Sequence, residues 1–133
     1  MTGVLDTSVV VALPGLTDPQ VLPHEAVICS VTLAELSVGP LVADDPVERS
    51  RRQAVLQQAE RDFAPIPFDA ACARAFGSVA ASLRARGRRH KARAFDALIA
   101  ATALAYDLPL YTCNAEDFAG IHGLEVRALP PPQ

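Results

Sequence analysis

The stretch of residues 94–118 constrains the fold most strongly, because its first half is apolar on every face of a helix except at Asp96. A helix without a polar face must be buried inside the protein. A carboxylate in its first turn is costly to bury unless a cation or good hydrogen-bond donors meet it. Leu108–Thr112 then has the composition of a short buried strand and leads directly to Asn114 and Asp117. Open α/β sheets place their chemistry at such strand ends, so we expect a functional site here.

Short apolar segments alternate with helical patterns along the rest of the chain. This alternation predicts a three-layer α/β fold with a central parallel sheet flanked by helices. We expect strands over residues 3–6, 26–29, 108–112 and 124–126. We expect helices over residues 7–13, 30–38, 46–63, 70–86 and from 94 onward.

Capping residues define where several of these helices begin. We expect Thr7 or Ser8 to cap the first helix, Ser30 the second, the pair 44–45 the third and Asp69 the fourth. In the second helix, three-and-four spacing predicts a buried stripe of Val31, Ala34, Glu35 and Val38, and Gly39–Pro40 provides a stop.

Length and composition favour one domain over residues 1–133, with a frayed tail at 129–133. Half of the residues are hydrophobic and 20% are charged, which excludes a disordered chain. The 3 cysteines are far apart and odd in number, which favours free thiols in a reducing compartment. The chain begins without the basic residues of a secretory signal, and no apolar run approaches the roughly 20 residues that span a bilayer. We therefore expect a cytoplasmic protein with no membrane partner.

Four acids recur at the same kind of position in the expected fold. Asp6 and Asp117 lie at or just beyond the carboxyl ends of strands, whereas Glu35 and Asp96 lie near the starts of helices. All four can converge on one rim of the sheet, where their mutual repulsion would raise their pKa values unless a cation is bound. Because every ligand offered is a hard oxygen, the pattern favours Mg²⁺, with Mn²⁺ as a substitute, over zinc.

Such a metal commonly serves phosphoryl chemistry by polarising the phosphate and activating a water molecule. The hydroxyls of Thr7, Ser8 and Thr112 and the amide of Asn114 are placed to orient that water or the acids.

A basic segment directly precedes Asp96, although the net charge of the chain is -3. Its candidate RNA-binding residues are Arg84, Arg86, Arg88, Arg89, Lys91 and Arg93. Such residues can hold the phosphates that flank a cleaved bond. A positive flank beside a negative centre predicts a nuclease.

Each of these residues also has a structural interpretation. Asp96 is placed as a helix cap, Thr32–Glu35 matches a capping box, and Asp6 precedes a turn-and-cap pair. Asp117 is explained as a solvated side chain, and a run of arginines is usually a solvated surface. Capping, however, does not require acids to recur after successive strands, whereas a metal site does.

The order of the motifs Leu5–Ser8, Thr32–Leu36, Phe95–Ala101 and Leu110–Phe118 resembles that of PIN-domain ribonucleases. Within that family the chain resembles the VapC toxins of bacterial toxin–antitoxin pairs. The resemblance spans nearly the whole chain. It implies a PIN-like three-layer sandwich and a Mg²⁺-dependent endoribonuclease that cleaves single-stranded or loop RNA. It also implies a homodimer and a cognate antitoxin that wraps the toxin and blocks its site.

Carried over by position, Asp6, Glu35 and Asp96 match the three most constant acids of the family, and Asp117 matches the fourth. The resemblance makes all four both catalytic residues and metal ligands. Relatives differ in whether the fourth acid or the residue at the Asn114 position reaches the metal.

Two other functions are open to these residues. A phosphoacceptor receiver domain shares the size, the sheet and the acids, but it needs a lysine after its last strand, and the chain's only lysine is Lys91. A non-catalytic RNA- or partner-binding domain would use the basic segment 84–93. Its RNA binding would be salt-sensitive and would survive the loss of Asp6 or Asp96.

Overall fold

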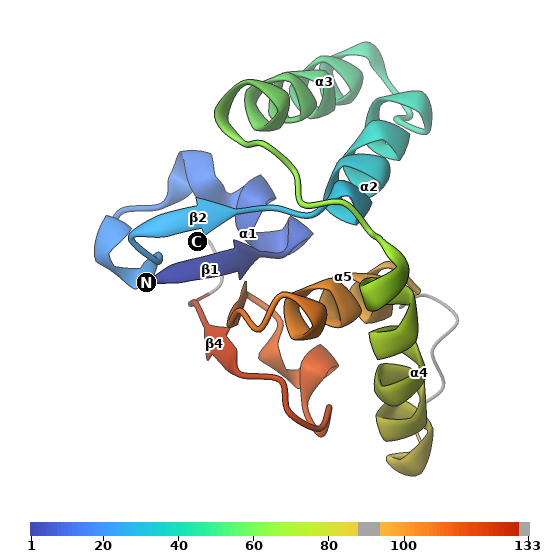
Figure 1. Ribbon diagram of the computed structural model, residues 1–133. Coiled ribbons are helices and arrows are strands. Elements are labelled where there is room, and N and C mark those ends of the chain that lie inside the picture. Colours follow the sequence, from blue (N-terminus) through green and yellow to red (C-terminus); the bar gives the residue numbers. More distant parts are fainter. Residues whose placement is uncertain (88–93, 131–133) are drawn as a thin grey trace.

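A parallel sheet forms the centre of the protein, whose computed structural model describes residues 1–87 and 94–130 (Figure 1). The strands in the described part of the chain are β1 (Thr2–Leu5), β2 (Glu25–Val27), β3 (Leu110–Thr112) and β4 (Val126–Ala128). They form a 4-stranded sheet in the order β2-β1-β3-β4, and each neighbouring pair is parallel. The predicted parallel sheet is therefore confirmed, and the carboxyl ends of its strands share one edge.

Helices connect these strands and cover the sheet. The α-helices of the described residues are α1 (Thr7–Ala12), α2 (Ser30–Leu41), α3 (Pro46–Asp62), α4 (Ala70–Ala85) and α5 (Ala94–Ala105). Short 3₁₀ turns are η1 (Leu13–Gly15), η2 (Pro19–Val21) and η3 (Ala115–Phe118). Over residues 1–87 and 94–130, no helix combines the length and the apolar composition that crossing a membrane requires.

Alternating residues of the strands pack into two separate cores, one on each face of the sheet. Val4 pairs with Leu110 in register, and both pack in the core that contains α4 and α5. The next pair, Leu5 and Tyr111, points to the opposite face and packs with residues of α1, α2 and α3. Because successive strand side chains point to opposite faces, a sheet with apolar residues on both faces must be covered on both. The predicted three-layer α/β sandwich is confirmed.

Helix α5 is the most deeply buried helix, as its composition predicts. Ile99, Ala100, Ala101, Thr102 and Ala103 are all 0% exposed. The alanines let the helix approach the sheet closely, and the Thr102 hydroxyl donates a hydrogen bond to the Leu98 carbonyl at 3.0 Å.

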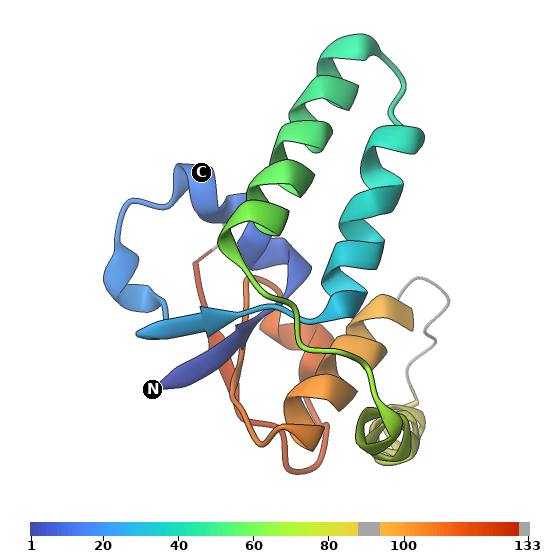
Figure 2. The same cartoon turned by 45° about the horizontal axis from the view of Figure 1, so that its top comes forward.

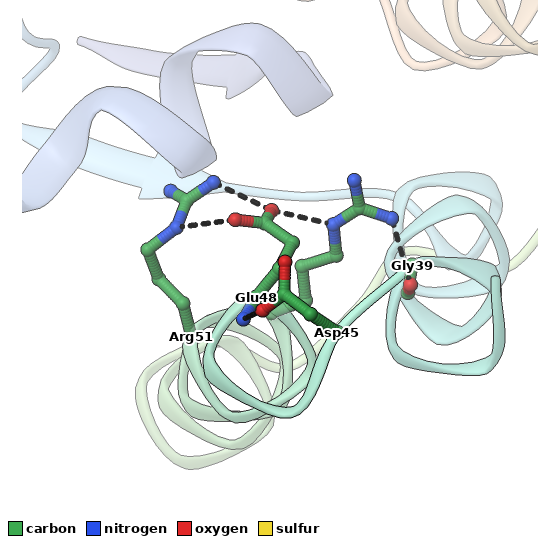
Figure 3. A network of polar contacts seen from close by, with 5 residues as sticks. Gly39, Asp45, Glu48 and Arg51 are labelled. Carbon is green, nitrogen blue, oxygen red and sulfur yellow. Dashed lines mark hydrogen bonds and ion pairs between the residues drawn. The ribbon is translucent and has the colours of Figure 1, made fainter. Parts of the chain in front are cut away.

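Helices α2 and α3 lie side by side and project away from the sheet (Figure 2). Arg52 joins them, because its guanidinium donates to the Gly39 carbonyl of α2 at 2.9 Å and to Glu48 of α3 at 2.7 Å (Figure 3). Arg51 also binds Glu48, and Asp45 caps α3 by accepting from the Glu48 amide at 2.8 Å. The predicted caps at residue 45 and at Asp69 are confirmed.

The caps of the first two helices differ from expectation. Asp6, rather than Thr7 or Ser8, caps α1 by accepting from the Val9 amide. Ser30 does not cap α2, because its hydroxyl accepts from the Phe68 amide at 3.2 Å.

The predicted stripe on α2 is also wrong in part. Val31 is buried, but Val38 is 45% exposed, and the buried side chains of α2 are Val31, Thr32, Leu36 and Pro40. Helix α2 continues through Pro40 to Leu41 and packs against α3.

The last strand begins later than expected, at Val126 instead of Leu124. The predicted frayed tail at 129–133 is wrong at Leu129, which is 4% exposed and whose amide donates to the Thr112 carbonyl at 2.8 Å. Residues 131–133 lie outside the described part of the chain.

Candidate active site

Asp6 is the central residue of the carboxyl edge of the sheet. It follows β1 directly and is 3% exposed. One carboxylate oxygen, Oδ1, accepts from the Ser8 hydroxyl at 2.6 Å and from the Val9 amide at 3.1 Å. The other, Oδ2, accepts from the Thr112 hydroxyl of β3 at 2.5 Å. Both oxygens of this buried carboxylate are therefore held in fixed orientation.

The turn after β3 orients the two hydroxyls. The Cys113 amide donates to the Ser8 hydroxyl oxygen at 3.0 Å, and the Asn114 amide donates to the Thr112 hydroxyl oxygen at 2.9 Å. Each hydroxyl thus accepts a hydrogen bond from a backbone amide and donates its own hydrogen bond to Asp6. The backbone amide of Asn114 takes part here, and the expected role of its side-chain amide stays a prediction. Cys113 takes part through its backbone amide and also through its thiol, which lies 3.9 Å from the Ser8 carbonyl oxygen, and no sequence signal indicates either contact.

Burial raises the pKa of Asp6 above the ordinary value of 3.8, and the hydrogen bonds from Ser8, Thr112 and Val9 oppose this rise. Within the described residues, the groups that influence this pKa include no cation. A desolvated carboxylate that is held only by neutral donors is stabilised by any positive charge placed beside it.

Glu35 reaches the same region from α2. Its carboxylate accepts from the Thr7 hydroxyl at 2.6 Å, and the Thr32 hydroxyl lies 3.4 Å from that of Thr7. Because Thr7 follows Asp6 directly, this bond ties Glu35 to the end of β1. The capping-box interpretation of Glu35 is not supported, since Thr32 lies inside α2 and the helix begins at Ser30.

Asp96 and Asp117 lie at this edge by topology. Helix α5 ends shortly before β3 begins, so its opposite end, which carries Asp96, extends toward the carboxyl edge. Asp117 lies in η3, which follows β3 and contacts α5. Both side chains are partly buried.

The four acids do not form a closed cluster. In residues 1–87 and 94–130, no group of three or more His, Cys, Asp and Glu side chains is arranged to hold a metal ion. The structure joins Asp6 to Ser8 and Thr112, and Glu35 to Thr7, and it places Asp96 and Asp117 at the same edge. Their roles as metal ligands stay a prediction.

Most of the basic segment, Arg88, Arg89, Lys91 and Arg93, lies outside the described residues. Arg84 is exposed in the last turn of α4. Arg86 has a structural contact, because its guanidinium donates to the Ala119 carbonyl and its side chain packs against Gly120. This contact anchors α4 to the turn that follows η3, a role that the sequence did not indicate.

The fold and the acidic edge define an α/β protein that presents its polar side chains at the carboxyl ends of parallel strands. Comparison with known proteins identifies the family, because residues 3–123 match the family model described as the PIN domain.

Individual relatives show to which group within this family the chain belongs. The chain is 37% identical over 123 residues to Ribonuclease VapC5 of Mycobacterium tuberculosis, which covers 91% of this chain and 88% of the relative. It is 39% identical over 101 residues to Ribonuclease VapC8 of the same species, covering 76% and 89%. The chain therefore belongs to the PIN domain family and, within it, to the VapC group.

Solved structures show the same fold. The crystal structure of VapBC-5 from M. tuberculosis, a member of the VapBC family of toxin–antitoxin systems, matches with a TM-score of 0.79 at 35% identity, covering 96% of this chain and 98% of that chain. VapBC2 from Rickettsia felis, bound to a DNA fragment from its promoter, matches with a TM-score of 0.76 at 26% identity, covering 97% and 99%.

Proposed function

We propose that this protein is a Mg²⁺-dependent endoribonuclease, the toxin of a toxin–antitoxin pair, that hydrolyses phosphodiester bonds in single-stranded or loop RNA. The observation that carries the proposal is Asp6, a carboxylate buried at the carboxyl edge of the sheet, whose hydrogen-bond donors within residues 1–87 and 94–130 are all neutral. The relatives named Ribonuclease VapC support the class of reaction.

The four candidate ligands suit Mg²⁺ or Mn²⁺ in chemical type, because all are carboxylates and because, among the described residues, the groups that shift the pKa of Asp6 include no cation. The structure, in the part of the chain that it describes, does not gather three of them into one closed set. Asp6, Glu35, Asp96 and Asp117 are the residues that would hold the ion. When bound, the ion supplies charge stabilisation at the phosphate and acidifies a bound water molecule.

The chain's own residues prepare this chemistry. Ser8 and Thr112 fix the direction of the Asp6 oxygens, so that little reorganisation is needed when a cation and a phosphate arrive. Thr7 does the same for one oxygen of Glu35. Carboxylates at this edge are also the groups available to accept the proton that a nucleophilic water releases.

The test is cleavage of a labelled RNA by protein that has been stripped with EDTA and then supplied with Mg²⁺ or Mn²⁺. We expect cleavage only after metal addition, and loss of cleavage in Asp6→Asn and Asp96→Asn. Asp107→Asn is the matched control, because Asp107 is exposed just beyond the opposite end of α5 and its positive φ of 55° suits asparagine. Full activity in EDTA, or in Asp96→Asn, would refute the proposal.

The proposed partners are a cognate antitoxin and a second copy of the chain. Similarity to VapBC toxin–antitoxin complexes supports the first. Exposed apolar side chains where α2 leads into α3, namely Leu41, Val42 and Val47 at 84%, 61% and 79% exposure, support a protein partner of some kind. Light scattering after gel filtration, with and without the antitoxin, measures both assemblies. A monomeric mass that does not change when the antitoxin is added would contradict both.

A further inference from the structure

Phe95 differs from every other phenylalanine of the chain. Phe118 is 1% exposed, and Phe63, Phe68 and Phe76 pack against the two cores. Phe95 belongs to neither core and is 36% exposed. A ring left partly in water contributes less to folding than a buried one, and its exposed surface stays available for contact with a ligand.

Its position is the first turn of α5, one residue before Asp96. That turn faces the carboxyl edge of the sheet, where Asp6 and Thr112 meet. The Cα atoms of Phe95 and Asp96 are about 3.8 Å apart on one helical turn, although their side chains diverge around the helix. A nucleotide whose phosphate reaches Asp96 therefore lies beside the turn that carries this ring.

We propose that Phe95 is a stacking platform for an unpaired nucleobase beside the cleaved phosphate. The inference rests on the proposed function and deepens it by naming a residue that selects single-stranded substrate. Every base has a π-face that an aromatic ring can cover, so stacking tolerates any sequence. A base inside a duplex has both faces occupied by its neighbours and cannot stack on the protein without leaving the helix.

Tyr106 provides an internal comparison. It is 37% exposed and follows the other end of α5, roughly 16 Å from Phe95 along the helix axis. Eleven residues correspond to about three helical turns, so the two rings lie on nearly the same side of the helix. The Tyr106 hydroxyl donates to Asp69 at 3.2 Å, at the start of α4 and away from the acids. Exposure and ring size are therefore similar, whereas Tyr106 lies away from the acids and its hydroxyl is bonded to Asp69.

The test measures binding of a fluorescein-labelled single-stranded RNA by fluorescence anisotropy in EDTA, so that no cleavage occurs. We expect Phe95→Ala to weaken binding about tenfold, which corresponds to about 1.4 kcal/mol, and Phe95→Tyr to restore it. Phe95→Leu, which keeps apolar volume but lacks a π-face, should not restore binding. Tyr106→Ala should bind as the wild type does. Thermal melting of each variant confirms that it is folded.

A second arm uses RNA in which the nucleotides flanking the mapped cleavage site are made abasic one at a time. At one of these positions the wild type should bind the abasic RNA more weakly than the intact RNA. Phe95→Ala should bind the abasic and the intact RNA with equal affinity. Binding by Phe95→Ala within twofold of the wild type, or equal rescue by leucine, would overturn the stacking inference. Wild-type protein that binds through Phe95 but does not cleave with Mg²⁺ would overturn the proposed function and leave the stacking inference standing.

Discussion

Replacing Thr112 with valine tests the construction of the site directly. Thr112 is 0% exposed, and its hydroxyl donates to Asp6 at 2.5 Å while accepting from the Asn114 amide. Valine has nearly the same shape, so the substitution removes hydrogen bonds without opening a cavity. A hydrogen bond to a charged group contributes about 1.5–3 kcal/mol, and Asn114 is exposed enough for water to replace its acceptor. We therefore expect Thr112→Val to lower the free energy of unfolding by about 2 kcal/mol.

Urea unfolding in EDTA at neutral pH measures this loss, which should also lower the melting temperature by roughly 6 °C. Thr102→Val is the matched control. Thr102 is equally buried, but its hydroxyl donates to a neutral carbonyl that already belongs to the α5 helix. We expect that change to cost less than about 1 kcal/mol. Equal unfolding midpoints for the two valine variants would show that Thr112 does not hold the Asp6 carboxylate.

Three further predictions concern the same edge and the strand that leads to it. Because burial raises the pKa of Asp6, the native state binds this proton more tightly than the unfolded chain, so metal-free stability should fall as pH rises above about 4. Asp6→Asn, which keeps a capping side chain, should melt higher than the wild type at pH 7 in EDTA, and a pH-independent difference would contradict this. Mg²⁺ at a hundred times its Kd should stabilise the wild type by about 2.7 kcal/mol but leave Asp96→Asn unchanged, as measured by melting; an equal response in both would argue against Asp96 as a ligand. Gly3→Ala should cost about 1–3 kcal/mol in urea unfolding, because its Cβ would lie 2.4 Å from the Tyr111 ring; Gly77→Ala, whose Cβ meets nothing within 4 Å, should stabilise the protein instead.

The fold could be predicted from the sequence wherever burial follows from composition alone. Helix α5 has no polar face to present to water, so its central position in the core needed no further information. The cap of α1 could not be predicted in the same way. Asp6, Thr7 and Ser8 are all good capping residues, and only the backbone path shows that Asp6 is the extended residue before the helix.

The sequence could nominate candidate residues for the site but could not predict their hydrogen bonds. Acids at strand ends identified Asp6 as a candidate, yet its bond to Thr112 joins positions 106 residues apart in the chain. Such a contact depends on which strands are neighbours, and residue spacing does not contain that information. The prediction of the buried face of α2 was wrong for a related reason. Its exposed stripe was predicted as buried because the pattern assumes that the whole helix lies on the sheet, whereas its second half packs on α3.

Asp6 caps α1 with the same carboxylate that faces the proposed reaction, which matters for anyone who wants to trap uncleaved RNA on this protein. The usual inactivating change to alanine would also remove the cap and cost about 1 kcal/mol, so a loss of activity could arise from a loosened helix. Asparagine keeps the cap while removing the charge. Crystals of a substrate complex should therefore be sought with Asp6→Asn, which keeps α1 capped while it removes the charge and the acceptor of the Thr112 hydroxyl.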